Sequence, residues 1–307
     1  MKTVLITGAN RGLGVEFVEH YVRNGWRVIA TARRLDGSER LRSLQPWKLV
    51  QLDTSDEASI LRAAAELTDV PVDLLINNAG ILFSRGMEDS TKADILEQFE
   101  VNAVGPFLTT RALLPNLRLA VQERGSAFVA QITSRLGSIG LNAESGYYGY
   151  RASKAALNMI STSLVRDLTD EKIAVLMLHP GYTSTDMSKG KGDYSPPQSV
   201  ALMAKVIARA TRMPTDLLAS LHDLELRDPT REELFNGPKR DKLPAAIQEL
   251  STDETACTFC GVSYFVFAEV QELQATVKKY KQTFHSSPES SSQETAIALR
   301  LRSSSGN

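Results

Sequence analysis

The chain has 307 residues, of which 42% are hydrophobic and 23% charged, as in ordinary soluble globular proteins. Its formal net charge of −1 creates no field that would attract nucleic acid or an anionic membrane, so neither is expected as a partner. No apolar run is long enough to span a bilayer, no signal peptide is recognisable, and two cysteines cannot form a disulfide framework. These features predict a cytoplasmic protein with one large core and an appendage, or with two small domains.

The first predicted element is a short β-branched and aliphatic strand over residues 3–6. A glycine-rich turn follows, and an amphipathic helix then runs to about residue 24. Glycines let a backbone approach a pyrophosphate closely, and a helix N-terminus supplies free N–H groups and the positive end of a dipole. The order strand, turn, helix predicts a nucleotide-binding βαβ unit, with a plain tight turn as the alternative. The turn reads Thr7-Gly8-Ala9-Asn10-Arg11-Gly12-Leu13-Gly14.

The second strand is expected over residues 27–34, and its end carries Ala32, Arg33 and Arg34. NAD sites usually place an acidic residue here to bind the ribose 2′-hydroxyl. Two guanidinium groups suit a 2′-phosphate instead, because arginine presents several donors in a rigid fork. Arg11, in the glycine turn, is a third candidate. The sequence therefore favours NADP(H) over NAD(H); the alternative is a basic strand end that faces solvent.

Two more strands are expected over residues 47–52 and 72–76, with a helix over about 57–67 between them. Asp53 follows the first of these strands, and the polar turn Asn77-Asn78-Ala79-Gly80 follows the second. This alternation of strand and helix predicts an α/β fold with a Rossmann-type, doubly wound parallel sheet.

A long helix is expected from about residue 91 to 119, and it contains Pro106. Because proline has no N–H, the carbonyl of Asn102 loses its usual helical partner and the helix should kink there. If this helix lines a cofactor cleft, the freed carbonyl could hold a water molecule that starts a proton relay. A kink without chemistry explains the pattern equally well.

The fifth strand, over residues 126–132, delivers Ser134 to the carboxyl end of the sheet, where doubly wound folds bind ligands. The helix after it, about 148–169, carries Tyr150 and Lys154, which are four residues apart and so share one face. A cation beside a phenol lowers the pKa of the phenol. The pair is therefore a candidate acid/base, although its spacing alone also fits a solvated helix face.

A sixth strand over 172–178 and a helix over 198–212 complete a pattern that resembles the short-chain dehydrogenase/reductase family. Its C-factor/sniffer-type carbonyl reductase branch is the most similar in the run Tyr150–Met159. The resemblance covers about residues 1–212 and is carried by the glycine turn, Asn77-Asn78-Ala79-Gly80, Ser134 ahead of Tyr150 and Lys154, and Pro180-Gly181 with Thr185.

The resemblance implies a catalytic tetrad. Tyr150 is similar to the family's proton donor in carbonyl reduction. Lys154 is similar to the residue that lowers the pKa of that phenol and binds the nicotinamide ribose. Ser134 resembles the group that holds the substrate oxygen, and Asn102 the anchor of the relay water. Lowering a phenol pKa from about 10 to about 7 needs about 4 kcal/mol. The implied cofactor contacts are Gly8, Asn10, Arg11, Gly12, Leu13, Gly14, Arg33, Asp53, Asn78, Ala79, Gly80, Tyr150, Lys154, Pro180, Gly181, Thr183 and Thr185.

The rest of the chain departs from the family. We expect residues 213–283 to be an extension of uncertain structure and 284–307 to be a disordered, serine-rich tail. Cys257 and Cys260 form a lone C-x-x-C, which is more typical of two ordinary cysteines than of a metal site, so no metal is expected.

Together these features predict an NADPH-dependent oxidoreductase that reduces an aldehyde or ketone to an alcohol. The alternative is an NADP(H)-sensing or signalling protein with little turnover. The resemblance also suggests a homodimer, because family members commonly pair through the helices that carry Asn102 and Tyr150.

Overall fold

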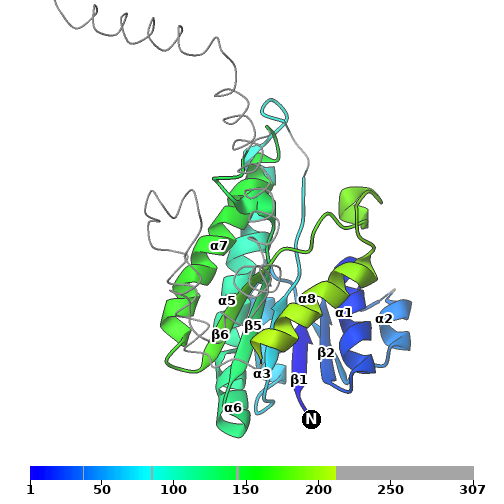
Figure 1. Ribbon diagram of the computed structural model, residues 1–307, viewed down its shortest axis with the longest axis vertical. Helices are drawn as coiled ribbons and strands as arrows, with labels where there is room; N and C mark the ends of the chain where they lie inside the picture. The colour runs from blue at the N-terminus through cyan, green and yellow to red at the C-terminus, as the bar shows by residue number, and fades with distance from the viewer. Residues whose placement is uncertain (37, 84–85, 143–144, 212–307) are drawn as a thin grey trace, which may run out of the picture.

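The computed structural model describes residues 1–36, 38–83, 86–142 and 145–211 (Figure 1). The predicted parallel α/β sheet is confirmed: six parallel strands follow the order β3-β2-β1-β4-β5-β6. The predicted extension, the serine-rich tail and the Cys257/Cys260 pair lie outside the described residues. The strands are β1 Thr3–Ile6, β2 Arg27–Ala32, β3 Lys48–Gln51, β4 Leu74–Asn77, β5 Ala127–Ile132 and β6 Ile173–Leu178.

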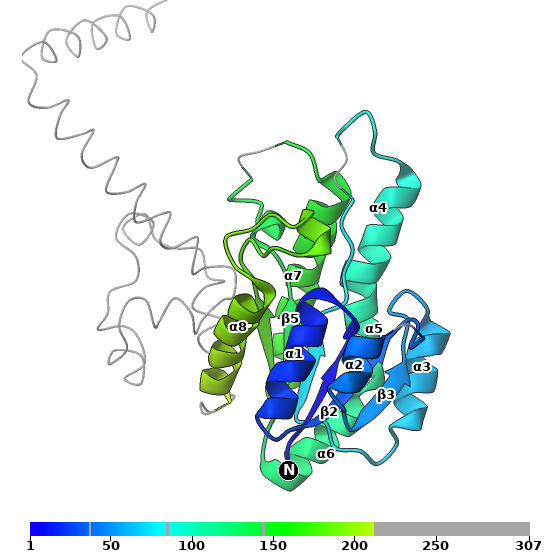
Figure 2. The same cartoon turned by 90° about the vertical axis from the view of Figure 1, so that its right-hand side faces the viewer.

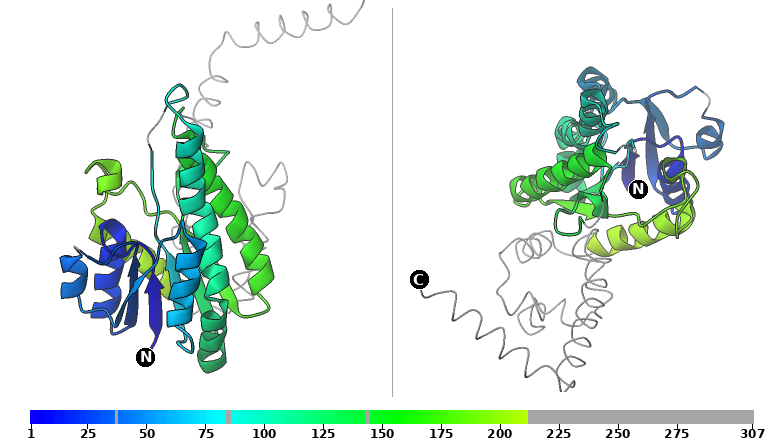
Figure 3. Two further views of the ribbon diagram at one scale, coloured as in Figure 1. Left: turned by 180° about the vertical axis from the view of Figure 1, so that it is seen from behind. Right: turned by 90° about the horizontal axis from the view of Figure 1, so that it is seen from above.

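Helices cover both faces of this sheet (Figures 2 and 3). Successive side chains of a strand point to opposite faces, so Val4 and Ile6 of β1 pack into one buried cluster and Leu5 into the other. The first cluster lies under α1, α2 and α8, and the second under α3, α5, α6 and α7. No helix in the described part of the chain is long and apolar enough to cross a membrane. The helices are α1 Gly12–Arg23, α2 Glu39–Ser43, α3 Glu57–Glu66, α4 Lys92–Phe99, α5 Gly105–Ala112, α6 Leu114–Arg124, α7 Tyr148–Leu168 and α8 Pro196–Ala210.

The helical segment predicted over residues 91–119 is present, but it is divided and extends to Arg124. The segment is divided into α4, a π-helical turn over Glu100–Val104, α5 and α6. The π-helical turn contains Asn102 and lies directly before α5, whose first turn holds Pro106. A second proline, Pro115, lies in the first turn of α6, where a missing N–H costs no helical hydrogen bond. A π-helical turn therefore lies where the kink was expected, and the helical segment is interrupted later, at Leu113.

Candidate active site

A cleft of about 830 Å³ lies where the strands end. Residues that follow each of the six strands line it, as expected for a doubly wound sheet. The lining includes most of the predicted cofactor contacts: Gly8, Asn10, Arg11, Gly12, Leu13, Arg33, Asp53, Asn78, Ala79, Gly80, Tyr150, Lys154, Pro180 and Thr185.

The glycine turn has the backbone shape that a pyrophosphate site requires. Gly8 has φ +63° and Gly12 φ +53°, both in the left-handed region that favours glycine. A Cβ on Gly14 would lie 2.0 Å from the carbonyl oxygen of Gly8, so α1 can approach β1 only without a side chain there. The N-cap residue Arg11 makes no side-chain capping bond, and the first turn of α1 holds no acidic residue. The free backbone N–H groups at the start of α1 can therefore bind an anion, and the glycine turn with this helix N-terminus fits a dinucleotide phosphate.

Thr7 and Asn78 hold the glycine turn in place. The Thr7 hydroxyl oxygen accepts hydrogen bonds from the backbone N–H groups of Asn78 and Ala79, both at 3.0 Å. The Asn78 amide donates to the carbonyl oxygens of Thr7 at 2.9 Å and Gly8 at 3.2 Å. The side chain of Asn78 thus fixes the backbone at the start of the glycine turn. The sequence placed Thr7 at the start of the glycine turn but indicated no role for it, because its partners Asn78 and Ala79 are more than 70 positions away.

Cations gather at one end of the cleft. Arg33 and Arg34 are exposed and line it just beyond β2, with no acidic residue at the position that NAD sites use. Arg11 lies 3.5 Å from Asp186, so this ion pair joins the glycine turn to the segment after β6. Asp53 accepts hydrogen bonds on Oδ1 from the N–H group of Ser55 at 3.0 Å and from its hydroxyl at 2.7 Å.

Ser134, Tyr150 and Lys154 come together at the other end. All three are buried, with exposed fractions of 7%, 8% and 5%. The hydroxyl groups of Ser134 and Tyr150 are hydrogen-bonded to one another. The Lys154 ammonium donates to the carbonyl oxygen of Ile132 at 2.7 Å and lies 5.9 Å from the centre of the Tyr150 ring.

The pKa of Tyr150 moves in the direction opposite to that expected. Burial raises it to about 12, against a smaller lowering by the hydrogen bond with Ser134. Burial also lowers the pKa of Lys154 to about 8. Both shifts have one cause: a site with little water disfavours whichever form carries charge. The protein's own groups therefore keep the phenol protonated at neutral pH. Lowering the pKa of this phenol from about 12 to about 7 takes about 7 kcal/mol. An ordinary tyrosine, which starts from a pKa of about 10, needs only about 4 kcal/mol.

Asn102 is fully buried, and its side chain connects three segments. Its Oδ1 accepts from the N–H group of Ile81 at 2.8 Å, and its Nδ2 donates to the carbonyl oxygen of Ile81 at 2.8 Å and to the Ser153 hydroxyl at 3.0 Å. The Ser153 hydroxyl donates in turn to the carbonyl oxygen of Tyr150 at 2.8 Å. The prediction concerned only the main-chain carbonyl of Asn102, so this side-chain network is an addition.

Gln98 supports the same loop one helical turn earlier. It is 1% exposed, and its Oε1 accepts from the N–H group of Phe83 at 2.8 Å. A Cβ on Gly149 would lie 2.5 Å from the Gln98 amide nitrogen, so α4 and the start of α7 fit closely only with a glycine before Tyr150. A polar residue inside a predicted helix gave no sign of this contact, which depends on tertiary packing.

Five predicted site residues do not line the cleft: Gly14, Asn102, Ser134, Gly181 and Thr183. Gly14 packs against Gly8, and a Cβ on Gly181 would lie 2.9 Å from the Tyr194 ring. The Thr183 hydroxyl donates to the carbonyl oxygen of Pro180 at 2.9 Å. Within the described segments, no group of three or more His, Cys, Asp or Glu side chains is arranged to hold a metal ion.

Comparison with known proteins identifies the family. A family model described as short chain dehydrogenase matches residues 2–195, well over half of the chain. The protein belongs to the short-chain dehydrogenase family. A second model, described as leucine, glutamate and lysine rich protein 1, matches residues 238–306, outside the described part.

Its relatives confirm the predicted resemblance to C-factor and sniffer-type proteins. C-signal of Myxococcus xanthus is 44% identical over 138 residues, which cover 45% of this chain and 81% of that protein. An NADPH-bound carbonyl reductase from chicken fatty liver is 36% identical with a TM-score of 0.62, covering 67% of this chain and 90% of the other. The carbonyl reductase Sniffer of D. melanogaster is 29% identical with a TM-score of 0.64, covering 68% and 92%.

Proposed function

We propose that this short-chain dehydrogenase uses NADPH to reduce an aldehyde or ketone to an alcohol. The observation that carries the proposal is the buried cluster of Ser134, Tyr150 and Lys154 at one end of a cleft whose other end carries Arg33 and Arg34. The carbonyl reductases among its structural neighbours support the same reaction.

In this proposal the Tyr150 hydroxyl donates its proton to the carbonyl oxygen of the substrate. The Ser134 hydroxyl, already hydrogen-bonded to that phenol, holds the same oxygen. The Lys154 ammonium, on the same face of α7, stabilises the phenolate that remains and takes part in its reprotonation. When bound, the nicotinamide supplies the hydride. The side chain of Asn102 holds Ile81 directly and the backbone of Tyr150 through the Ser153 hydroxyl. Its main-chain carbonyl anchors the relay water.

Cofactor choice follows from charge. A 2′-phosphate carries negative charge into the end of the cleft lined by Arg33 and Arg34, and Arg11 also lines this cleft. Arginine donors recognise phosphate strongly because these hydrogen bonds are charge-assisted. The remaining predicted contacts, Gly181 and Thr183 among them, are proposed to shape the nicotinamide end through the segment after β6.

Consumption of NADPH tests the reaction. Purified protein is mixed with NADPH and a panel of aldehydes and ketones, and absorbance at the nicotinamide band is followed beside a Tyr150→Phe variant. We expect turnover with some carbonyls and a large loss in the variant. Equal rates in both proteins would refute the mechanism. Tight NADPH binding with no turnover on any carbonyl would favour the NADP(H)-sensing alternative.

Assembly and location stay predictions. Pairing of two copies through the helical segment that carries Asn102, from α4 to α5, and through α7 is supported by exposed apolar side chains on α4 and α7, among them Leu96, Phe99 and Met159. A cytoplasmic location likewise remains a proposal from composition.

A further inference from the structure

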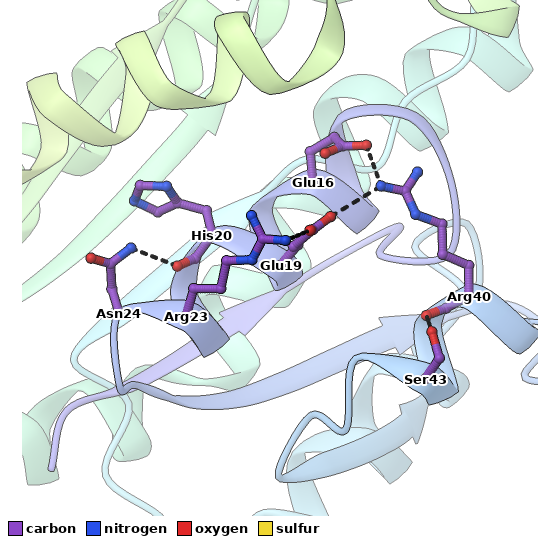
Figure 4. Close-up of polar contacts among 7 residues, drawn as sticks. All are labelled: Glu16, Glu19, His20, Arg23, Asn24, Arg40 and Ser43. Atoms are coloured by element: carbon purple, nitrogen blue, oxygen red, sulfur yellow. Dashed lines mark hydrogen bonds and ion pairs between the residues drawn. The ribbon is translucent and has the colours of Figure 1, made fainter.

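Arg40, on the short helix α2, connects the two helices beside the cationic end of the cleft. Its guanidinium lies 2.6 Å from the Glu16 carboxylate and 3.1 Å from that of Glu19, both on α1 (Figure 4). Glu19 is also paired with Arg23, whereas Arg40 supplies the ion pair of Glu16. Arg40 therefore binds two successive turns of α1 and holds α2 beside the helix that begins at the glycine turn.

Glu16 makes this contact more than a surface ion pair. Its side chain is only 10% exposed, while that of Arg40 is 56% exposed. A carboxylate with so little exposure to water is costly to leave without a partner, so loss of Arg40 should cost more here than at a fully exposed ion pair. Both contacts are made by one nitrogen of Arg40, Nη2, so a single charged donor group lies between the two carboxylates.

Helix α2 is tied in turn to the backbone that carries Arg33 and Arg34. The guanidinium of Arg42 donates to the carbonyl oxygen of Leu35 at 3.0 Å. The side-chain amide of Gln51, at the end of β3, donates to the carbonyl oxygen of Arg33 at 3.1 Å. The chain leaving β2 is thus held on one side by the sheet and on the other by α2.

These contacts form one path from α1 through Arg40 and α2 to the two arginines that line the cleft. We propose that Arg40 is a positioning residue for recognition of the cofactor's 2′-phosphate: through its ion pairs with α1 it fixes α2, so that the backbone after β2 presents Arg33 and Arg34 to that phosphate. The inference rests on the proposed NADP(H) preference, and it adds a residue that does not itself line the cleft.

Binding of 2′,5′-ADP and 5′-ADP, measured by calorimetry on the full chain, tests this without turnover. The ratio of the dissociation constant of 5′-ADP to that of 2′,5′-ADP gives the factor by which the 2′-phosphate strengthens binding. We expect Arg40→Gln to reduce that ratio about tenfold, as when one charge-assisted hydrogen bond is weakened. Arg40→Lys, which keeps the charge, should restore much of it. Affinity for 5′-ADP should change little in either variant.

Two further variants make the result decisive. Arg42→Gln releases the Leu35 carbonyl without touching buried Glu16, so it should lower the ratio even if Arg40→Gln does not fold. Arg118→Gln is the matched control: Arg118 pairs with Glu171 at 2.6 Å on another part of the molecule, and its loss should leave the ratio unchanged.

The outcomes separate the two proposals. If the unaltered protein binds 2′,5′-ADP no better than 5′-ADP, the NADP(H) preference is wrong, and the role of Arg40 fails with it. If the unaltered protein prefers 2′,5′-ADP and folded Arg40→Gln and Arg42→Gln keep the full preference, only the positioning role of Arg40 is wrong.

Discussion

Replacing Asn102 with leucine separates the role of its side chain from that of its main chain. The Asn102→Leu variant keeps the main-chain carbonyl proposed to anchor the relay water, but it removes three hydrogen bonds. The N–H and carbonyl groups of Ile81 and the hydroxyl of Ser153 each lose a partner. Ile81 is only half-buried, so water can reach it in part. We therefore expect a loss of about 2–4 kcal/mol in the free energy of unfolding, toward the low end for three such groups.

The loss should appear in both stability and function. For a domain of this size it corresponds to a fall of about 5–15 °C in the melting temperature. Release of Ile81, which lines the cleft, should also lower kcat by about 100-fold, because small displacements of a reacting group are costly. The assays are denaturant unfolding, NADPH binding and steady-state turnover.

A second buried asparagine supplies the control. The amide of Asn116 donates to the carbonyl oxygens of Leu67 at 2.6 Å and Val70 at 2.9 Å, away from the cleft lining. Asn116→Leu should lose comparable stability yet keep the kinetics of the unaltered protein at a temperature where both variants are folded. If Asn102→Leu matches the unaltered protein in stability and turnover, the side-chain network is unimportant and only the main-chain role stands.

Three further predictions address the cleft. Burial lowers the pKa of Lys154 from its ordinary 10.5 to about 8. Between these pH values the unfolded chain binds more protons than the folded chain, so Lys154 makes the free energy of unfolding rise with pH. Lys154→Met should remove a rise of about 3 kcal/mol in the free energy of unfolding between pH 8 and pH 10.5, measured by denaturant unfolding at a series of pH values. An identical pH profile in the two proteins would contradict the burial of the ammonium. A Cβ on Gly137 would lie 2.7 Å from the backbone of Lys154, whereas one on Gly140 meets nothing within 4 Å. Gly137→Ala should therefore lower turnover and the melting temperature while Gly140→Ala changes neither, and equal effects would show that this close approach is not needed. Arg33→Ala should raise KM for NADPH at least tenfold and leave KM for NADH nearly unchanged, and a parallel change in both would remove the argument for a 2′-phosphate site.

Local chemistry allowed much of the fold to be predicted. Glycines with positive φ, strands of aliphatic residues and amphipathic helices each depend on neighbours in the sequence, and their alternation fixes a parallel sheet. Ser134 and Tyr150 are sixteen positions apart, yet both could be assigned because β5 must end where doubly wound folds bind ligands. Helix α2 escaped prediction because five residues with one buried leucine, Leu41, carry too little periodicity.

What could not be predicted depends on tertiary contacts. The side-chain bonds of Asn102, the support of Phe83 by Gln98 and the pairing of Arg40 with Glu16 join segments that sequence spacing does not relate. The pKa of Tyr150 is the clearest case. Spacing placed a cation on the same helix face, but burial, which sequence does not measure, reversed the direction of the shift.

Titration of Tyr150 in the presence and absence of NADP⁺ tests the central claim most directly. Tyrosinate absorbance of the unaltered protein is recorded against pH, and the same curve for Tyr150→Phe is subtracted. The free protein should show a phenol with a pKa of about 12. The account predicts that with NADP⁺ the difference curve moves to a pKa of about 7, where the phenol can exchange protons at neutral pH. A phenol that still titrates above about 10 in the complex would contradict the claim that the bound cofactor tunes Tyr150 into an acid/base that works at neutral pH.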